Sequence, residues 1–172
     1  MRRIIALLLL GLWGWCGPAP AAAPGMRILL FGDPQVKSEQ DLDYFRRDIV
    51  EPLRGRHRAQ PGTSLGDIVD DVPAPLPAVR RETERLGVPW LHVPGNHDVD
   101  PDAQDDAGSL RSFRRGIGPD TMVRETALAN VVVLDDVIAL PGRKPAYIGG
   151  FRDDQFAQLE ARLPALRKDR LL

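Results

Sequence analysis

The sequence predicts an α/β fold in which strands alternate with helices. From Met26 onward, short apolar runs alternate with segments of helical periodicity, and each of the first three runs ends beside a glycine. Of the 172 residues, 43% are hydrophobic and 27% are charged, which is typical of a folded globular chain. The formal net charge of −1 gives no basic field of the kind that nucleic-acid-binding proteins carry.

The N-terminal half contains two strand–helix units and a third strand. Residues 26–32 form a continuous apolar run, as expected for a buried strand. Residues 38–53 begin with a serine that can cap a helix and carry apolar residues at helical spacing. Residues 63–66 and 88–94 are further strands, and the helix expected at 78–86 between them is followed by a glycine.

The C-terminal half is expected to be less regular. The expected elements follow in order: an acidic loop at 100–108, a short helix at 109–116, a hairpin of strands 121–127 and 130–135, a loop at 141–150, an amphipathic helix at 153–163, and the beginning of a strand at 170–172. After the first strand at 26–32, the run NVVVLDD that begins at Asn130 is the clearest strand of the sequence.

The first 24 residues have the pattern of a secretory signal peptide. Two arginines precede an apolar run at 4–15, and a tract rich in Pro and Ala follows. The run is shorter than the roughly 20 residues that a membrane span needs. We expect cleavage near Ala21 or Ala23, a periplasmic or secreted protein, and no membrane span in the mature chain. An uncleaved N-terminal anchor is the alternative.

Cys16 raises the possibility of a lipoprotein. Lipoprotein signals have a small residue directly before the cysteine, however, and this chain has Trp15 there, so the resemblance fails at that position. We therefore expect no lipid anchor. Cleavage after Cys16 leaves a mature chain without cysteine, which needs no disulfides in an oxidising compartment. The expected organisation is a signal peptide at 1–24 and one domain over 25–172.

Three polar segments follow the first three strands. They are Gly-Asp-Pro-Gln at 32–35, Gly-Asp-Ile-Val-Asp at 66–70 and Gly-Asn-His-Asp at 95–98. In α/β folds the loops after the carboxyl ends of strands hold the ligands, so we expect these segments on one rim. One Gly-Asp after a strand is usually a turn. Three such segments in order, the last of them uncommon by chance, indicate a site.

Oxygen donors dominate this predicted rim. Carboxylate and amide oxygens suit divalent ions such as Mn, Mg, Fe or Zn. A carboxylate that lies between two ions can bridge them. A pair of such ions stabilises both the attacking and the leaving oxygen of an in-line displacement at phosphorus, and it lowers the pKa of the water that attacks.

These segments resemble the successive metal motifs of the calcineurin-like metallophosphoesterase superfamily, D-x-H, G-D-x-x-D and G-N-H-[DE]. The later stretches VVVLDD, YIGG and DDQF are similar to a bacterial branch whose first motif is DPQ. The resemblance extends over about 27–172. It implies a layered β-sandwich flanked by helices, two divalent ions and a phosphoester substrate.

The resemblance also implies a role for each residue. Asp33 binds the first ion, Asp67 bridges both ions and Asn96 binds the second. His97 stabilises the phosphoryl group or protonates the leaving oxygen. Asp98 orients His97 and sets its tautomer.

The sequence departs from the family pattern at two places. Gln35 stands where the common first motif has His, which makes the ligand set richer in oxygen and leaves open whether Gln35 touches the ion. The later histidine motifs do not occur before Leu172. His57 is expected to be solvated and His92 to be packed in its strand, so neither replaces them.

We therefore expect a metal-dependent phosphoester hydrolase, either a phosphomonoesterase or a phosphodiesterase, with an incomplete C-terminal part. We also expect this chain to be a truncated form of a longer enzyme and weakly active alone. The alternative is a non-catalytic remnant, or a module that binds a metal or a partner. Asp70, the last residue of the second motif, is expected either to support the metal ligands by contacting them or to order its loop.

Overall fold

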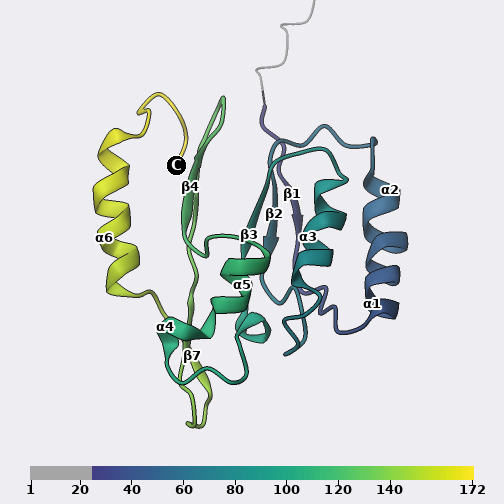
Figure 1. The fold of residues 1–172 in the computed structure, drawn as a ribbon. Helices are drawn as coiled ribbons and strands as arrows, with labels where there is room; N and C mark the ends of the chain where they lie inside the picture. Colours follow the sequence, from purple (N-terminus) through teal and green to yellow (C-terminus); the bar gives the residue numbers. More distant parts are fainter. Residues whose placement is uncertain (1–24) are drawn as a thin grey trace, which may run out of the picture.

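The computed structural model describes residues 25–172 (Figure 1), so the signal peptide predicted at 1–24 lies outside the described residues. The elements follow in the order β1 (Leu29–Phe31), α1 (Glu39–Tyr44), η1 (Phe45–Val50), α2 (Glu51–Leu53), β2 (Gly62–Leu65), α3 (Leu76–Glu84), β3 (Trp90–Val93), η2 (Asn96–Asp98), α4 (Asp106–Ser109), α5 (Arg111–Gly116), β4 (Met122–Glu125), β5 (Asn130–Val133), β6 (Val137–Ala139), β7 (Tyr147–Gly149), α6 (Asp153–Arg162) and η3 (Leu163–Ala165).

The first three strands form a parallel sheet in the order β1-β2-β3. Leu30 pairs with Thr63, and Thr63 pairs with Leu91, so these three side chains lie on one face of the sheet. Because all three strands run in one direction, their carboxyl ends meet at one edge. The sequence prediction of three strands with a common rim is confirmed.

The helix expected at 38–53 is confirmed as a nearly continuous helical segment over α1, η1 and α2. The Ser38 hydroxyl accepts the backbone N–H of Asp41 at 3.2 Å, and the Asp41 carboxylate accepts the N–H of Ser38 at 2.9 Å. This reciprocal capping satisfies two of the backbone donors that a helix start leaves unpaired. The middle of the segment, η1, is a π-helical stretch that carries the buried Phe45 and Val50.

The hydrophobic core lies between these helices and one face of the sheet. Its buried members are Val36, Leu42, Phe45, Val50, Ile68, Val69, Leu76, Val79, Leu86, Leu110, Phe113 and Ile117. Phe31 on β1 connects the sheet to this core, with its ring centroid 5.4 Å from that of Phe45 and 5.1 Å from that of Trp90. Because side chains alternate along a strand, residues such as Leu30 and Leu65 point to the opposite face of the sheet, where they are 56% and 61% exposed.

The C-terminal half contributes two antiparallel pairs of strands, β4 with β5 and β6 with β7. Figure 1 shows the β4–β5 hairpin between the parallel sheet and α6. The hairpin at 121–135 is as expected. The loop expected at 141–150 is wrong in part, because Tyr147 and Ile148 pair with Ala139 and Ile138. Aromatic and β-branched residues favour strands, and this local signal is present in the sequence.

Helix α6 is attached through a buried ionic network. The Arg152 guanidinium lies 2.6 Å from Asp135 Oδ2 and 3.1 Å from Asp120 Oδ2. Gln155 donates from Nε2 to the Asp135 carbonyl at 2.8 Å and to the Thr121 hydroxyl at 3.0 Å. Since Asp135 is fully buried, the contact with the Arg152 guanidinium is needed to compensate the charge of its carboxylate.

The described residues therefore have the mixed α/β structure that the sequence predicts. Their strands form one three-stranded parallel sheet and two antiparallel pairs. Between residues 25 and 172, every helix is too short or too polar to cross a membrane. For the site, the relevant result is the common edge at which β1, β2 and β3 end.

Candidate metal centre

The first two polar segments lie side by side beyond the ends of β1 and β2. Asp33 donates its backbone N–H to the Gly66 carbonyl at 3.1 Å, and Gln35 donates to the Asp67 carbonyl at 3.0 Å. Parallel pairing thus continues past the strands and fixes the spacing between the segments. The prediction that they share a rim is confirmed.

The third segment packs directly on Asp67. The backbone N–H of His97 donates to Asp67 Oδ1 at 3.0 Å. A Cβ at Gly95 would overlap both Oδ1 and the backbone nitrogen of Asp67. Only glycine permits this approach, and the glycine of the third motif therefore has a steric purpose.

Backbone strain is concentrated in the same place. Asp33, Gln35, Asp67 and Asp71 have φ values of 61°, 44°, 50° and 56°. Among the described residues, these four are the non-glycine positions in the left-handed region. Such a conformation costs roughly 1 kcal/mol per residue, and strain of this kind is typical of functional sites.

The donors fit a divalent cation. Asp33 and Gln35 are exposed, and Asp67 and Asn96 are half-buried, so each of these residues is accessible to solvent. Within residues 25–172, no Lys or Arg forms an ion pair with Asp33 or Asp67. The Asp67 Oδ1 atom accepts the backbone N–H of His97, so Oδ2 is the other oxygen that this carboxylate offers. Carboxylate and amide oxygens are donor types that suit hard metal ions.

Asp98 has a different contact from the one expected. Its Oδ1 accepts the backbone N–H of Val69 at 2.9 Å, and its Oδ2 accepts the N–H of Gly95 at 2.8 Å. The side chain is fully buried, and burial raises its pKa to about 6, against the hydrogen bonds that lower it. The expectation that Asp98 orients the His97 ring is therefore corrected: Asp98 connects the second segment to the third through their backbone amides.

The ring of His97 faces two other carboxylates. Its Nδ1 lies 2.9 Å from Asp71 Oδ1 and 3.7 Å from Asp70 Oδ1. Partial burial lowers the pKa of His97, but the hydrogen bond and charge of Asp71 outweigh it and raise the pKa above the ordinary value. Asp70 also accepts a hydrogen bond from Lys37 Nζ at 2.8 Å. This contact connects the loop after β2 to the loop after β1.

Asp70, Asp71 and His97 form a candidate metal-ligand group, because their ligand atoms lie within 4.8 Å of one another. This group differs from the predicted set of Asp33, Gln35, Asp67 and Asn96. The sequence analysis missed Asp71 and Lys37, which lie next to motif residues but outside the motif patterns. The only available signal was the run of two aspartates at 70–71.

The two remaining histidines are structural. His92 is 5% exposed, and its Nδ1 lies 2.9 Å from the Ser64 hydroxyl, which confirms the expectation of a packed strand histidine. His57 lies 3.0 Å from the Leu86 carbonyl through Nε2 and is half-buried. The expectation that His57 is solvated is therefore wrong.

A cavity of about 330 Å³ adjoins the first segment. The first segment contributes Asp33 and Gln35 to its lining. The helical segment contributes the apolar or aromatic Tyr44, Phe45 and Ile49 together with Asp41 and Asp48. An apolar and aromatic wall beside oxygen donors is a common form of small-molecule site.

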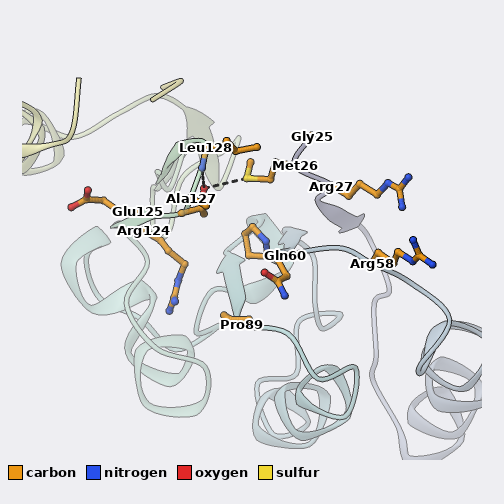
Figure 2. Close-up of a pocket in the computed structure, with 12 residues that line it drawn as sticks. Gly25, Met26, Arg27, Arg58, Gln60, Pro89, Arg124, Glu125, Ala127 and Leu128 are labelled. Atoms are coloured by element: carbon orange, nitrogen blue, oxygen red, sulfur yellow. Dashed lines mark hydrogen bonds between the residues drawn. The ribbon is translucent and has the colours of Figure 1, made fainter. Parts of the chain in front are cut away.

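A second cavity, of about 310 Å³, lies at the opposite ends of the strands. Gln60 precedes β2 in this cavity, and Gly25 and Arg27 precede β1. Figure 2 shows that Arg27 and Arg58 extend away from Arg124, so the three guanidinium groups do not converge on one point. This cavity is separate from the motif segments.

Comparison with protein families agrees with the geometry. The model of the family described as calcineurin-like phosphoesterase matches residues 26–168, which is most of the chain and includes all three segments. A comparison with curated protein sequences gives no match. Because the family match spans far more than half of the 172 residues, the chain belongs to the calcineurin-like phosphoesterase family.

Proposed function

We propose that this protein is a metal-dependent phosphoester hydrolase that uses two divalent ions, among Mn, Fe, Zn and Mg. The observation that supports the proposal is the contact of three motif segments around Asp67. Among residues 25–172, no Lys or Arg forms an ion pair with the carboxylates of Asp33 and Asp67. When bound, such ions polarise the phosphoryl oxygens and acidify water for the attack.

The chain's own residues would divide the remaining work. Asp33 and Gln35 would hold an ion from the first segment, Asn96 would hold one from the third, and Asp67 would face both. The His97 ring, whose Nε2 is the nitrogen opposite the Asp71 contact, would donate a proton to the departing alcohol. Asp98 supports this reaction through the backbone of the second and third segments.

The cavity beside Asp33 suits the alcohol portion of a phosphoester. Tyr44 is 44% exposed and Ile49 is 38% exposed, so both offer free apolar surface next to the donors. Monoesters and diesters both remain within this proposal. Signal-directed export to the periplasm or the outside of the cell is also proposed, on the pattern of residues 1–24.

We also propose that two sheet layers, flanked by helices, form the complete domain. The exposed apolar residues Leu30 and Leu65 support this arrangement, because they lie on the face of the parallel sheet that is opposite to the helices. A second sheet layer would cover such a face at a spacing of about 10 Å.

The direct test uses the purified chain with 4-nitrophenyl phosphate and bis(4-nitrophenyl) phosphate, in the presence of each divalent ion and then of excess chelator. We expect hydrolysis that depends on the ion and is lost in Asp67→Asn. The preferred substrate distinguishes a monoesterase from a diesterase. Hydrolysis that survives both the chelator and Asp67→Asn would contradict the proposal.

A non-catalytic binding module is the second candidate. It is favoured by the composition of the predicted ligand set, where Gln35 replaces the histidine of the common first motif and Asp33 and Asp67 are the charged members among the four. This candidate predicts that Asp67-dependent ion binding occurs without turnover of either ester.

A further inference from the structure

The contact between His97 and Asp71 has two parts. The His97 Nδ1 atom lies 2.9 Å from Asp71 Oδ1, and the Asp71 backbone N–H donates to the His97 carbonyl at 3.1 Å. An ionised carboxylate only accepts hydrogen bonds, so the proton of the contact must be on Nδ1. This contact therefore selects one tautomer of the neutral ring and leaves Nε2 for another partner.

Asp71 adopts a backbone conformation that few residues tolerate. Its φ of 56° lies in the left-handed region, where Asp and Asn occur more often than other non-glycine residues. The side chain is 60% exposed, so packing against the core does not explain the conformation. The paired backbone and side-chain contacts to His97 are the interactions that this conformation makes possible.

The neighbouring Asp70 is engaged in another contact. Val36 and Val69 form a parallel bridge, which brings Lys37 beside Asp70. Lys37 Nζ donates to Asp70 Oδ2 at 2.8 Å, whereas Asp70 Oδ1 is 3.7 Å from His97 Nδ1. At 3.7 Å the second separation is too long for a hydrogen bond.

We propose that Asp71 is the positioning residue for His97. It holds Nδ1 in the protonated form and directs Nε2 toward the oxygen of the departing alcohol, while Lys37 keeps Asp70 in a separate pair. This inference rests on the proposed function for the role of His97, but the Asp71 contact itself is independent of turnover.

The first test is independent of activity. Nitrogen-15 spectra of the imidazole rings, recorded on the full chain at alkaline pH, distinguish an Nδ1–H from an Nε2–H ring. Asp71→Gly removes the carboxylate and accepts the left-handed backbone, so it is the variant least prone to unfold. We expect His97 to be Nδ1–H in the wild type and to move to Nε2–H in Asp71→Gly. The signals of His57 and His92 should stay unchanged and so report an intact fold.

The matched control is Asp102→Gly, at an exposed aspartate of the acidic loop. It should leave the His97 signals unchanged, and Asp70→Gly should change them less than Asp71→Gly does. If His97 remains Nδ1–H in Asp71→Gly, or if Asp70→Gly is the variant that moves the proton, the proposal is overturned.

The second test separates positioning from general support of the fold. A 4-nitrophenolate leaving group needs no proton, whereas an alkyl alcohol does. In Asp71→Gly we expect kcat for an alkyl ester to fall about 10- to 100-fold, with a much smaller fall for the nitrophenyl ester.

An equal fall for both esters would overturn the positioning role. Absence of any hydrolysis in the wild type would instead count against the proposed function, and the nitrogen-15 result would still decide the Asp71 contact.

Discussion

The backbone N–H of His97 donates to Oδ1 of Asp67 at 3.0 Å, across thirty positions of sequence. This hydrogen bond places the third motif segment on the second. Because Asp67 also accepts the backbone N–H of Gln35 at its carbonyl, one residue joins all three segments. The predictions below follow from this arrangement and from the packing around it.

Gly95→Ala should destabilise the protein and displace Asp67. The added Cβ overlaps backbone and side-chain atoms of Asp67, which cannot move without breaking the contact to His97. We expect a loss of about 2 kcal/mol or more in the free energy of unfolding, measured with urea. The control is Gly32→Ala, whose Cβ would meet only Leu65 Cβ at 3.4 Å and should change stability by less than about 0.5 kcal/mol. Equal stability of the two variants would argue against the close approach.

Asp98→Ala should lower the free energy of unfolding, and its effect should not be confined to proton transfer. It removes the acceptor of two backbone N–H groups, those of Val69 and Gly95, in a fully buried position. Each unsatisfied buried donor costs about 1–3 kcal/mol, so we expect a loss of about 2–4 kcal/mol in urea unfolding. Asp102→Ala, at an exposed aspartate, is the control. An Asp98→Ala protein as stable as this control would show that the two amides have other partners.

Acidification should weaken the fold through His92. Burial, with a contribution from Arg80, lowers the pKa of His92 to about 4, against about 6.5 in the unfolded chain. Below pH 6.5 the unfolded state binds the proton more readily, so this contribution to stability is lost as the pH falls toward 4. The loss should reach about 2 kcal/mol by pH 5. Urea unfolding of the wild type and of His92→Gln at several pH values checks this, and the variant should lack the part of the pH dependence that comes from His92. If the free energy of unfolding changes with pH in the same way in both proteins, His92 is not the group responsible.

Arg152→Ala should detach α6. The substitution leaves the buried Asp135 without its cation, which typically costs about 3–5 kcal/mol. Thermal and urea unfolding measure the loss. Arg167→Ala, which breaks the exposed pair with Asp169, should cost less than about 1 kcal/mol. If both arginine variants lose similar stability, the Arg152 network does not carry α6.

The parallel sheet and its rim could be predicted from the sequence because their signals are local. The strands β1 and β3 are mostly apolar, whereas β2 is short and contains Thr63 and Ser64. A glycine stands beside the end of each of the three strands and permits the turn that follows, so the order of elements gives the common edge. Ser38 and Asp41 likewise form the capping pattern that marks the start of the first helix.

The partner of His97 could not be predicted in this way. Asp98 is adjacent in sequence, but successive residues of a 3₁₀ turn such as η2 point about 120° apart. Asp98 therefore faces the buried amides while His97 faces outward to Asp71. That contact depends on the left-handed backbone at Asp71, which neither composition nor periodicity specifies.

The measurement that tests the central claim most directly is calorimetric titration of Mn²⁺ into the purified chain, for wild type and Asp67→Asn. The amide that this substitution introduces retains an oxygen that can accept the His97 N–H, so the variant removes the charge while preserving the fold. We predict saturable binding to the wild type and affinity at least about 100-fold weaker in the variant. Equal affinities, or no binding to a folded wild type, would contradict a metal centre at Asp67.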